Sequence, residues 1–404
     1  KLSYKSFTIM PTIFKFVRSQ ALQMRPVGRY LFPWFRYTEP FLVHLSWSIS
    51  LTLLVFITGI GMLLYFFYGE VANNLDFTLI FCYWAFVIDV FVKILTIWMG
   101  RSSLGKAFKQ LKDVHPKNAS MAESVKLNEY FGLYKKWKKI MFFMDYLNMA
   151  LFTSIPVIKS VVEYVIAPAE QRSFNYELPF IGINPIRMTN PLVYIISYML
   201  QIYGCYVLTG FNLGSDLLLI SMVHLLNMHF EYLAKSIREF KPTGTDKDIK
   251  ELGHFISYHR DIIHSSERVD ETFSPAIFTN YFACGMMMCV LGFQIMAGPT
   301  AEMLIKFFVL LTSVLFHVYV ICMYGDRMIT LSLDVSDAFF EHRWYLAEKR
   351  YQKMVVLPIA RAQRPAHLTA FKFFDVTMES FKTLVSTTYQ FFTLLNSTLD
   401  EEQQ

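Results

Sequence analysis

The sequence is short of charge. Asp, Glu, Lys and Arg make up 17% of its 404 residues, whereas soluble domains carry about 25%. Hydrophobic residues account for 54%, with 39 Phe and 23 Tyr among the aromatics, and the mean hydropathy is +0.35. This composition excludes intrinsic disorder and argues against an ordinary soluble enzyme. It favours a chain that crosses a membrane several times.

Cysteines and catalytic motifs are also scarce. All five cysteines lie in apolar stretches, so we expect no disulfide framework of the secreted kind. The sequence contains no Walker loop, dinucleotide fingerprint, zinc-protease His-Glu pair or nucleophile elbow. His254, His259 and His264 recur every five residues, whereas metal ligands on one helix face lie three or four apart. We therefore expect no catalytic site, no metal site and no cofactor.

Long apolar runs dominate the chain. A transmembrane helix needs about 20 mostly apolar residues. Six stretches meet this requirement, and a seventh, Phe371–Leu395, is weaker because it is uncharged only from Thr383 onward. The apolar residues are continuous and do not alternate, which excludes outer-membrane strands. We predict an all-α membrane protein with seven transmembrane helices. The six stronger stretches are Leu42–Tyr68, Leu75–Met99, Ile140–Ile166, Pro191–Ser221, Pro275–Gly298 and Met303–Tyr324.

The basic residues predict the orientation of these spans. Of the 38 Lys and Arg, 31 lie in residues 1–41, 100–139, 222–270 and 325–370, and two lie in the alternate connecting segments. Because Lys and Arg are retained on the cytoplasmic side, we predict a cytoplasmic amino terminus. Seven spans then place the carboxyl terminus outside the cell. This is opposite to the orientation of a G-protein-coupled receptor.

The predicted cytoplasmic segments carry helical patterns of their own. Apolar residues continue at spacings of three and four from Leu226 to Phe240, so the fourth span should extend as an amphipathic rod until the Lys241-Pro-Thr-Gly break. Such faces need burial, either within the subunit or against neighbouring subunits, or they rest on the lipid interface. We predict four parts: a cytoplasmic segment at 1–41, a six-helix bundle at 42–324 with cytoplasmic extensions at 222–270, anchor helices at 325–370, and the seventh helix with an extracellular tail at 371–404.

Charges inside the predicted spans call for partners. Asp89 and Lys93 lie four apart on the second span and can pair along one face, and Lys159 and Glu163 have the same spacing on the third. Local pairs of this kind are unlike the unpaired midplane acid of many ion-coupled transporters. His317 lies alone in the sixth span. It is either a packed histidine or a contact in a pocket.

The seventh helix is the most informative. Its uncharged part, Thr383–Leu395, mixes hydroxyls and one amide with bulky apolar side chains. A helix that lines a water-filled path has this composition, and apolar residues near one end can gate such a path by dewetting. Alternatively, the hydroxyls bond carbonyls of their own helix.

A series of short motifs in the carboxyl-terminal part resembles the insect odorant receptors. In that family a Trp-Tyr pair precedes a basic Ser-Gln-Lys-Pro element, then Leu-Thr-Ala and a final Ser-Tyr-Ser-x-Phe-Thr-Leu-Leu stretch. The sequence departs from the family pattern at Ala362, Phe371 and Gln390, where Ser, Gly and Ser are usual. The matching runs are Asp337-Ala-Phe-Phe-Glu-His-Arg-Trp344-Tyr345, Leu357-Pro-Ile-Ala-Arg361-Ala-Gln-Arg-Pro365, Leu368-Thr-Ala370, Phe373-Phe374, Thr377-Met-Glu-Ser-Phe381 and Tyr389-Gln-Phe-Phe-Thr-Leu-Leu395.

The resemblance implies a volatile-gated, non-selective cation channel in the plasma membrane of a sensory neuron dendrite. Four subunits would surround one pore, either with the family co-receptor (Orco) or as a homotetramer. The co-receptor itself has a large insertion between its fourth and fifth spans, and here the segment between them is short, so the chain resembles a ligand-tuning subunit. By analogy, the seventh helix lines the pore, with the gate near Phe392 and Leu395 and with Gln390 and Thr393 as neighbours.

The same analogy places the odorant pocket in the outer half of the bundle, between the second, third, fourth and sixth spans. An aromatic pocket with few polar groups suits small volatile ligands. The candidates at helical spacing are Phe77, Phe81, Trp84, Phe152, Ile155, Tyr194, Tyr198, Gln201, Phe308 and Thr312.

Three alternatives stay open at this point. A gustatory-type channel would end in Thr-Tyr followed later by Gln-Phe; Thr388-Tyr389 is present but the later Gln-Phe is not. A seven-span membrane hydrolase would need clustered His and Asp ligands at the inner membrane face. A transporter would show inverted repeats, and the sequence has no evident internal repeat.

Overall fold

Long helices build nearly all of the part of the chain that the computed structural model describes. That part comprises residues 74–116, 119–168, 174–180, 190–296 and 301–402, together with Ile13, Phe16, Val17 and Met24. The predicted first span, 42–68, and most of the predicted segment 1–41 lie outside the described residues. The helices are α5 (Asn74–Val114), α6 (Ala119–Ser124), α7 (Leu127–Ile166), α8 (Pro191–Glu239), α9 (Asp246–Met296), α10 (Ala301–Glu341), α11 (Lys349–Ala362) and α12 (Met378–Glu402).

Five of these helices are long and apolar enough to cross a membrane. They are α5, α7, α8, α9 and α10. Four of them contain a whole apolar stretch predicted from the sequence, and α9 contains residues 275–296 of the fifth. In the described residues the remaining regular structure is a single 3₁₀ turn, Trp344–Leu346, and the two-residue strands β1 (Thr369–Ala370) and β2 (Phe374–Asp375). The all-α prediction is therefore confirmed. The sidedness of the termini stays a prediction.

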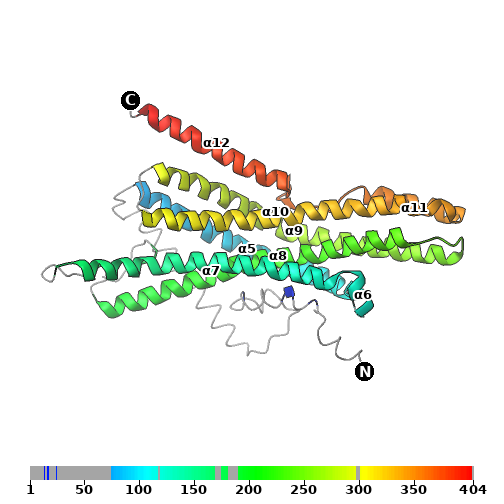
Figure 1. The fold of residues 1–404 in the computed structure, drawn as a ribbon, viewed down its shortest axis with the longest axis horizontal. Helices are drawn as coiled ribbons and strands as arrows, with labels where there is room; N and C mark the ends of the chain where they lie inside the picture. Colours follow the sequence, from blue (N-terminus) through cyan, green and yellow to red (C-terminus); the bar gives the residue numbers. More distant parts are fainter. Residues whose placement is uncertain are drawn as a thin grey trace, which may run out of the picture.

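Several helices continue well beyond the apolar stretches, and α8 does so as the rod pattern predicts. α8 runs unbroken to Glu239, and Gly244 then takes a positive φ of 77° before α9 begins at Asp246. The long helices lie side by side along the longest axis of the molecule (Figure 1). One end of the bundle holds the α8–α9 connection and α11, and we call it the distal end.

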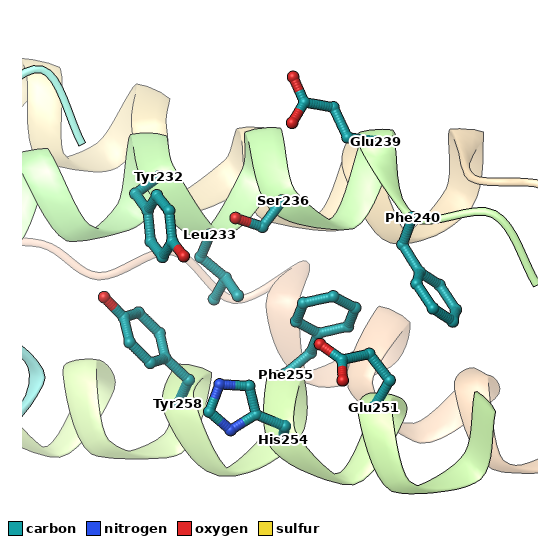
Figure 2. A pocket seen from close by; sticks show the side chains of 9 residues that line it. All are labelled: Tyr232, Leu233, Ser236, Glu239, Phe240, Glu251, His254, Phe255 and Tyr258. Atoms are coloured by element: carbon teal, nitrogen blue, oxygen red, sulfur yellow. The ribbon is translucent and has the colours of Figure 1, made fainter. Parts of the chain in front are cut away.

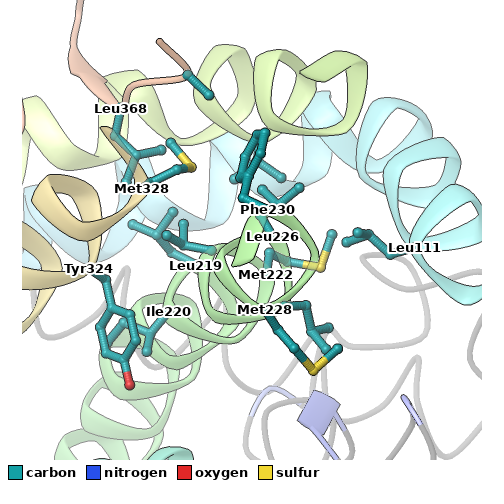
Figure 3. Close-up of a cluster of buried hydrophobic side chains, with 14 of the residues drawn as sticks. Leu111, Leu219, Ile220, Met222, Leu226, Met228, Phe230, Tyr324, Met328 and Leu368 are labelled. Carbon is teal, nitrogen blue, oxygen red and sulfur yellow. The ribbon is translucent and has the colours of Figure 1, made fainter. Parts of the chain in front are cut away.

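α8 forms the core of the bundle. Every residue from 213 to 230 is buried, so this stretch contacts neighbours on all sides, as expected for a helix that is apolar around its whole circumference. Figure 3 shows its side chains pointing outward toward several surrounding helices, with Tyr324 and Met328 of α10 and Leu111 of α5 among their neighbours. Met222 and Met228 belong to this cluster. Methionine is well suited to filling irregular gaps of this kind.

The segment before α12 is tied to the bundle. Thr369 donates from its backbone N–H to Asp270 of α9 at 2.6 Å, and the N–H of Phe371 donates to the carbonyl of Ser274 at 3.2 Å. β1 and β2 pair antiparallel around this turn, with Ala370 opposite Phe374. Beyond it, α12 leaves the bundle at an angle, and its far end lies apart from the other helices (Figure 1).

Candidate functional site

The end of the bundle opposite the distal end carries a cluster of aromatic rings. We call it the outer aromatic cluster, because the predicted orientation places this end outside the cell. Tyr194 and Tyr198 of α8 are each 7% exposed, and their ring centroids lie 5.5 Å apart. Phe174 and Tyr176 of the preceding segment pack on Tyr194 with centroids at 5.9 and 5.1 Å. Offset and edge contacts at these distances are favourable between aromatic rings.

The segment 174–180 is held over this cluster by polar contacts. Gln201 Oε1 accepts from the Phe180 N–H at 3.1 Å, and the Tyr194 hydroxyl donates to the carbonyl of Glu177 at 3.0 Å. Lys159 pairs with the Glu177 carboxylate at 2.8 Å. This corrects the predicted partner of Lys159: helical spacing suggests Glu163, but the connecting segment folds back and brings Glu177 to it.

α5 and α7 extend the same cluster. Tyr83 lies 5.2 Å from Phe180 and 6.4 Å from Phe152 in edge-on contacts, and Phe152 is 9% exposed. The Tyr198 hydroxyl donates to the carbonyl of Thr153 on α7. Trp84 and Ile155 are half-buried. The structure thus brings together the predicted Phe152, Tyr194, Tyr198 and Gln201 with Tyr83, which was not predicted.

On α10 the structure favours a different face from the predicted one. Phe308 is 72% exposed, and Thr312, also exposed, donates to the carbonyl of Phe308. Phe307, one residue earlier, is 6% exposed and packs with Leu291, Tyr83 and Leu311. One residue turns a helix by about 100°, so the predicted positions face away from this small cluster. The side chains of Phe77 and Phe81 lie outside the described residues.

Between the aromatic rings and the distal end, charged side chains meet in the middle of the bundle. We call them the polar network. Lys93 of α5 is 1% exposed, and its Nζ lies 3.0 Å from Asp89 Oδ2 and 2.9 Å from Asp216 Oδ1 of α8. It also donates to Asn212 Oδ1 at 2.6 Å and to Asn280 Oδ1 of α9 at 3.2 Å. The predicted Asp89–Lys93 pair is confirmed, but Lys93 is shared among three helices.

His317 of α10 continues the network on the other side of Asp216. Its Nδ1 lies 2.8 Å from Asp216 Oδ2, and its Nε2 lies 3.1 Å from Asp145 Oδ1 of α7. The Ser313 hydroxyl donates to Asp145 Oδ1 at 2.9 Å, and the Thr279 hydroxyl donates to Asp89 at 2.8 Å. Five helices therefore meet through one connected set of buried polar groups.

Sequence reasoning found Asp89, Lys93 and His317 but missed Asp145 and Asp216. Both acids lie inside apolar stretches, and Asp216 is 3% exposed and Asp145 7% exposed. An ionisable residue in a transmembrane stretch is a signal in itself. What the sequence does not show is that these acids, on two further helices, meet Lys93 and His317.

α12 is mostly exposed along its described length. Thr383, Ser386, Thr387, Tyr389, Gln390 and Thr393 are exposed, whereas Thr388 is 6% exposed and faces α9. The hydroxyls of Thr383, Thr388 and Thr393 donate to carbonyls of their own helix. The side chains of the two principal gate candidates, Phe392 and Leu395, lie outside the described residues.

The start of α12 contacts the bundle through a hydroxyl and through apolar side chains, Met378 and Phe381. Tyr281 of α9 lies with its hydroxyl 2.9 Å from Ser380 Oγ and 2.7 Å from Cys322 Sγ of α10. Phe381 packs edge-on against Tyr319 of α10 at 5.8 Å. These contacts join α12 to α9 and α10.

A separate cavity of about 330 Å³ lies between α8 and α9 near the distal end, lined by aromatic rings and two carboxylates, Glu239 and Glu251 (Figure 2). At its edge the Tyr258 hydroxyl lies 2.7 Å from His229 Nδ1. Burial raises the pKa of Tyr258 and lowers the pKa of His229 to about 3, so both groups are neutral at physiological pH. This cavity is some 40 residues along α8 from the outer aromatic cluster, about 60 Å at the usual helical rise.

Comparison with known proteins agrees with this architecture. The structure of the olfactory receptor OR5 from Machilis hrabei in complex with eugenol superimposes with a TM-score of 0.79 at 16% identity, over 96% of this chain and 98% of that one. The ligand-free structure of the same receptor gives a TM-score of 0.78. At such identity the match establishes the fold, an all-α bundle of the seven-transmembrane kind.

Sequence comparison establishes the family. The chain is 27% identical over 334 residues to putative odorant receptor 85d of Drosophila melanogaster, covering 81% of this chain and 80% of the relative. Putative odorant receptor 92a of the same species is 29% identical over 308 residues, 74% of each chain. The profile of the 7tm Odorant receptor family matches residues 73–389.

The fold and the spans define a multi-pass membrane receptor. The chain belongs to the insect odorant receptor family. Membership in a family of receptors sets aside the hydrolase and transporter alternatives, and the odorant-receptor profile sets aside the gustatory one.

Proposed function

We propose that the chain is an odorant-gated, non-selective cation channel subunit. It binds a small volatile molecule in the outer half of the bundle and opens a central pore lined by α12. The observation that carries the proposal is the pairing of a buried aromatic cluster at one end of the bundle with a helix, α12, that departs from the bundle with its polar side chains exposed.

The ligand is held among the rings of α5, α7 and α8. Tyr194, Tyr198 and Phe152 supply apolar surface, and the segment 174–180 covers them through its contact with Gln201. Aromatic sites with few polar groups bind small apolar ligands chiefly by burying their surface. The receptor of Machilis hrabei that shares this fold was solved with eugenol, an aromatic volatile, which supports a ligand of similar chemistry here.

α12 lines the pore once four subunits surround a common axis. Its exposed Ser386, Thr387 and Gln390 then face water, and Phe392 and Leu395 form the apolar constriction, with Thr393 beside them. An odorant that binds better to a conformation with separated α12 helices shifts the population toward the open pore. The partners are the family co-receptor in a heterotetramer, or further copies of this chain, in the plasma membrane of a sensory neuron dendrite.

Whole-cell recording tests the proposal directly. The chain is expressed alone and together with the co-receptor, surface expression is confirmed by labelling, and currents are recorded while a panel of volatiles is applied. We expect an odorant-evoked cation current in at least one of the two conditions. Surface-expressed protein without any evoked current in either condition would refute the channel function.

Phe392→Ala tests the pore register. Shortening an apolar constriction eases wetting of the pore, so we expect a larger basal current or altered ion permeability, with the ranking of odorants unchanged. Thr383→Ser is the control, because it keeps the hydroxyl that bonds its own helix at the carbonyl of Glu379. A change in odorant ranking with normal permeation would place Phe392 in the binding site and contradict the assignment.

A further inference from the structure

The polar network is expensive to bury. Each ion placed in a low-dielectric interior costs several kcal/mol, and well-packed apolar side chains would often serve stability as well or better. Lys93, Asp89 and Asp216 are each at most 4% exposed, inside apolar stretches of their helices. Packing of the bundle therefore gives no reason for them, and a functional role is the expected explanation.

The network lies on the same helices as the outer aromatic cluster. On α8, Gln201 precedes Asp216 by 15 residues, about 22 Å at the helical rise. On α7, Phe152 and Asp145 are two turns apart, and on α10, Leu311 and His317 are less than two turns apart. A rigid helix that moves at the outer aromatic cluster therefore also moves at the polar network.

The network also reaches α12. Thr279 and Asn280 of α9 belong to it, and the next residue, Tyr281, contacts Ser380 in the first turn of α12 and Cys322 of α10. One turn further along α9, a side chain at Gly285 would meet Leu384 and Thr388 of α12 at 3.6 and 3.9 Å. α9 thus carries both the network and the contact surface for the proposed pore helix.

One side of the network is incompletely satisfied. His317 Nε2 lies 3.1 Å from Asp145 Oδ1, yet among the described residues neither this nitrogen nor Asp145 Oδ2 makes an aligned hydrogen bond. The other ring nitrogen is well placed on Asp216 at 2.8 Å. A small shift of α7 against α10 would align the Asp145 contact. A bridge with one aligned and one unaligned contact can take up a second arrangement, and a conformational switch requires two.

We propose that the polar network couples the outer aromatic cluster to α12, with the Asp145–His317–Asp216 bridge as its switching contact and Tyr281 as its connection to the pore helix. These side chains are positioning residues: they set the relative placement of α7, α8, α9 and α10 and do not touch the odorant. The inference rests on the channel function proposed above.

Asp145→Asn and His317→Gln, alone and combined, test the bridge, and Tyr281→Phe tests its connection to α12. Coupling energies between sites correspond to about 5- to 150-fold changes in affinity, so we expect each bridge variant to raise the half-maximal odorant concentration on the order of tenfold. The shift should be the same for every active odorant in the panel, leaving their ranking intact. The double variant should shift by less than the product of the single shifts.

Two conservative substitutions serve as controls. Ser221→Ala removes a fully buried hydroxyl of α8 that bonds its own helix at Leu218, and Tyr319→Phe keeps the ring that packs on Phe381 of α12. Both should leave the half-maximal concentration unchanged. Odorant-dependent thermal stabilisation of the purified, detergent-solubilised proteins measures binding separately from current. We expect it to persist in Tyr281→Phe while the maximal evoked current falls.

The outcomes separate the channel function from the coupling role of the polar network. Wild-type protein at the surface without evoked current overturns the channel function and this inference with it. With wild-type currents present, bridge variants and Tyr281→Phe that behave like the controls overturn the coupling role alone. A reordered odorant ranking in Asp145→Asn also overturns it, because it would make Asp145 a ligand contact. Tyr281→Phe, which removes a single oxygen, keeps the test decisive if a charge variant fails to reach the surface.

Discussion

Phe371 adopts a backbone conformation that suits glycine. Its φ is 52° and that of Lys372 is 61°, both in the left-handed region, where a Cβ atom costs about 1 kcal/mol or more. The turn that these residues form connects β1 to β2 and directs the chain into α12. The family pattern has glycine at this position, and the structure supplies the physical reason.

Replacing Phe371 by glycine should relieve this strain. The ring is 55% exposed and lies 6.1 Å from Phe373 and 6.0 Å from Phe278, so its loss has a cost of its own. Phe371→Ala loses the same ring but keeps Cβ. We therefore expect Phe371→Gly to be more stable than Phe371→Ala by about 1 kcal/mol, measured by thermal denaturation of the solubilised protein. Equal stability of the two variants would mean that the turn rearranges.

Gln201 holds the segment 174–180 against α8. Its Oε1 accepts the backbone N–H of Phe180, and removing the acceptor from a part-buried N–H costs about 1–3 kcal/mol. Gln201→Leu should loosen this cover and raise the half-maximal concentration of odorants several-fold. Thr312→Val on the exposed face of α10 is the control. An unaltered dose–response curve in Gln201→Leu would place the ligand elsewhere.

At the scale of elements, the base of α12 is packed against α10 without room for a methyl group. A Cβ added at Gly325 would overlap the backbone carbonyl oxygen of Val376, which precedes α12 by two residues. Because the obstacle is backbone, a side chain cannot simply rotate away. Gly325 therefore fixes how closely α10 approaches the segment that positions the pore helix.

Gly325→Ala should disturb this approach, and Gly132→Ala is its matched control. Nothing lies within 4 Å of a Cβ built at Gly132 in α7, so alanine there should be neutral or slightly stabilising through its better helix propensity. We expect Gly325→Ala to lower thermal stability and evoked current, whereas Gly132→Ala changes neither. Surface labelling and whole-cell recording check both variants. Normal currents in Gly325→Ala would show that the α10–α12 joint tolerates displacement.

Periodicity predicted elements well because it depends on single helices. The spacing from Leu226 to Phe240 correctly extends α8, the Lys241-Pro-Thr-Gly break falls between α8 and α9, and the i, i+4 spacing gives the Asp89–Lys93 pair. Contacts between helices were harder to predict from the sequence. The predicted Phe308 lies one residue from the buried Phe307, and a register error of one residue changes the face of a helix.

The polar network and the segment 174–180 show more clearly what periodicity cannot predict. Asp216 meets Lys93 across 123 positions of sequence, and Glu177 meets Lys159 only because the connecting segment folds back. No local pattern encodes such pairings. The aromatic composition of the candidate site and its position along the helices, given by Tyr194, Tyr198 and Phe152, were thus predictable from the sequence. The contacts that these residues make with other segments were not.

At the scale of the whole molecule, exposed apolar side chains occur at both ends of the bundle. Those on the apolar stretches, such as Phe91 and Ile166, face the position of lipid tails. The distal end has a second set, which lies beyond the predicted apolar stretches: Phe340, Tyr345, Leu346, Val356 and Leu357 are each at least 59% exposed. Large apolar side chains exposed together on neighbouring elements favour an interaction site. Its position beside α11 fits the proposed packing of anchor helices between subunits.

Leu357→Glu tests that assembly surface. Leu357 is 76% exposed on α11, so a carboxylate there costs the isolated subunit little, but in a subunit interface it would be desolvated without a partner. We expect the variant to fold and to assemble poorly, giving fewer tetramers in subunit counting by single-molecule photobleaching and smaller evoked currents. Lys247→Glu, at an exposed position in the first turn of α9, adds a carboxylate at the same end of the molecule and should leave the tetramer count unchanged. If both variants assemble like wild type, the subunits meet through a different surface, and the apolar residues of α11 face lipid or another protein.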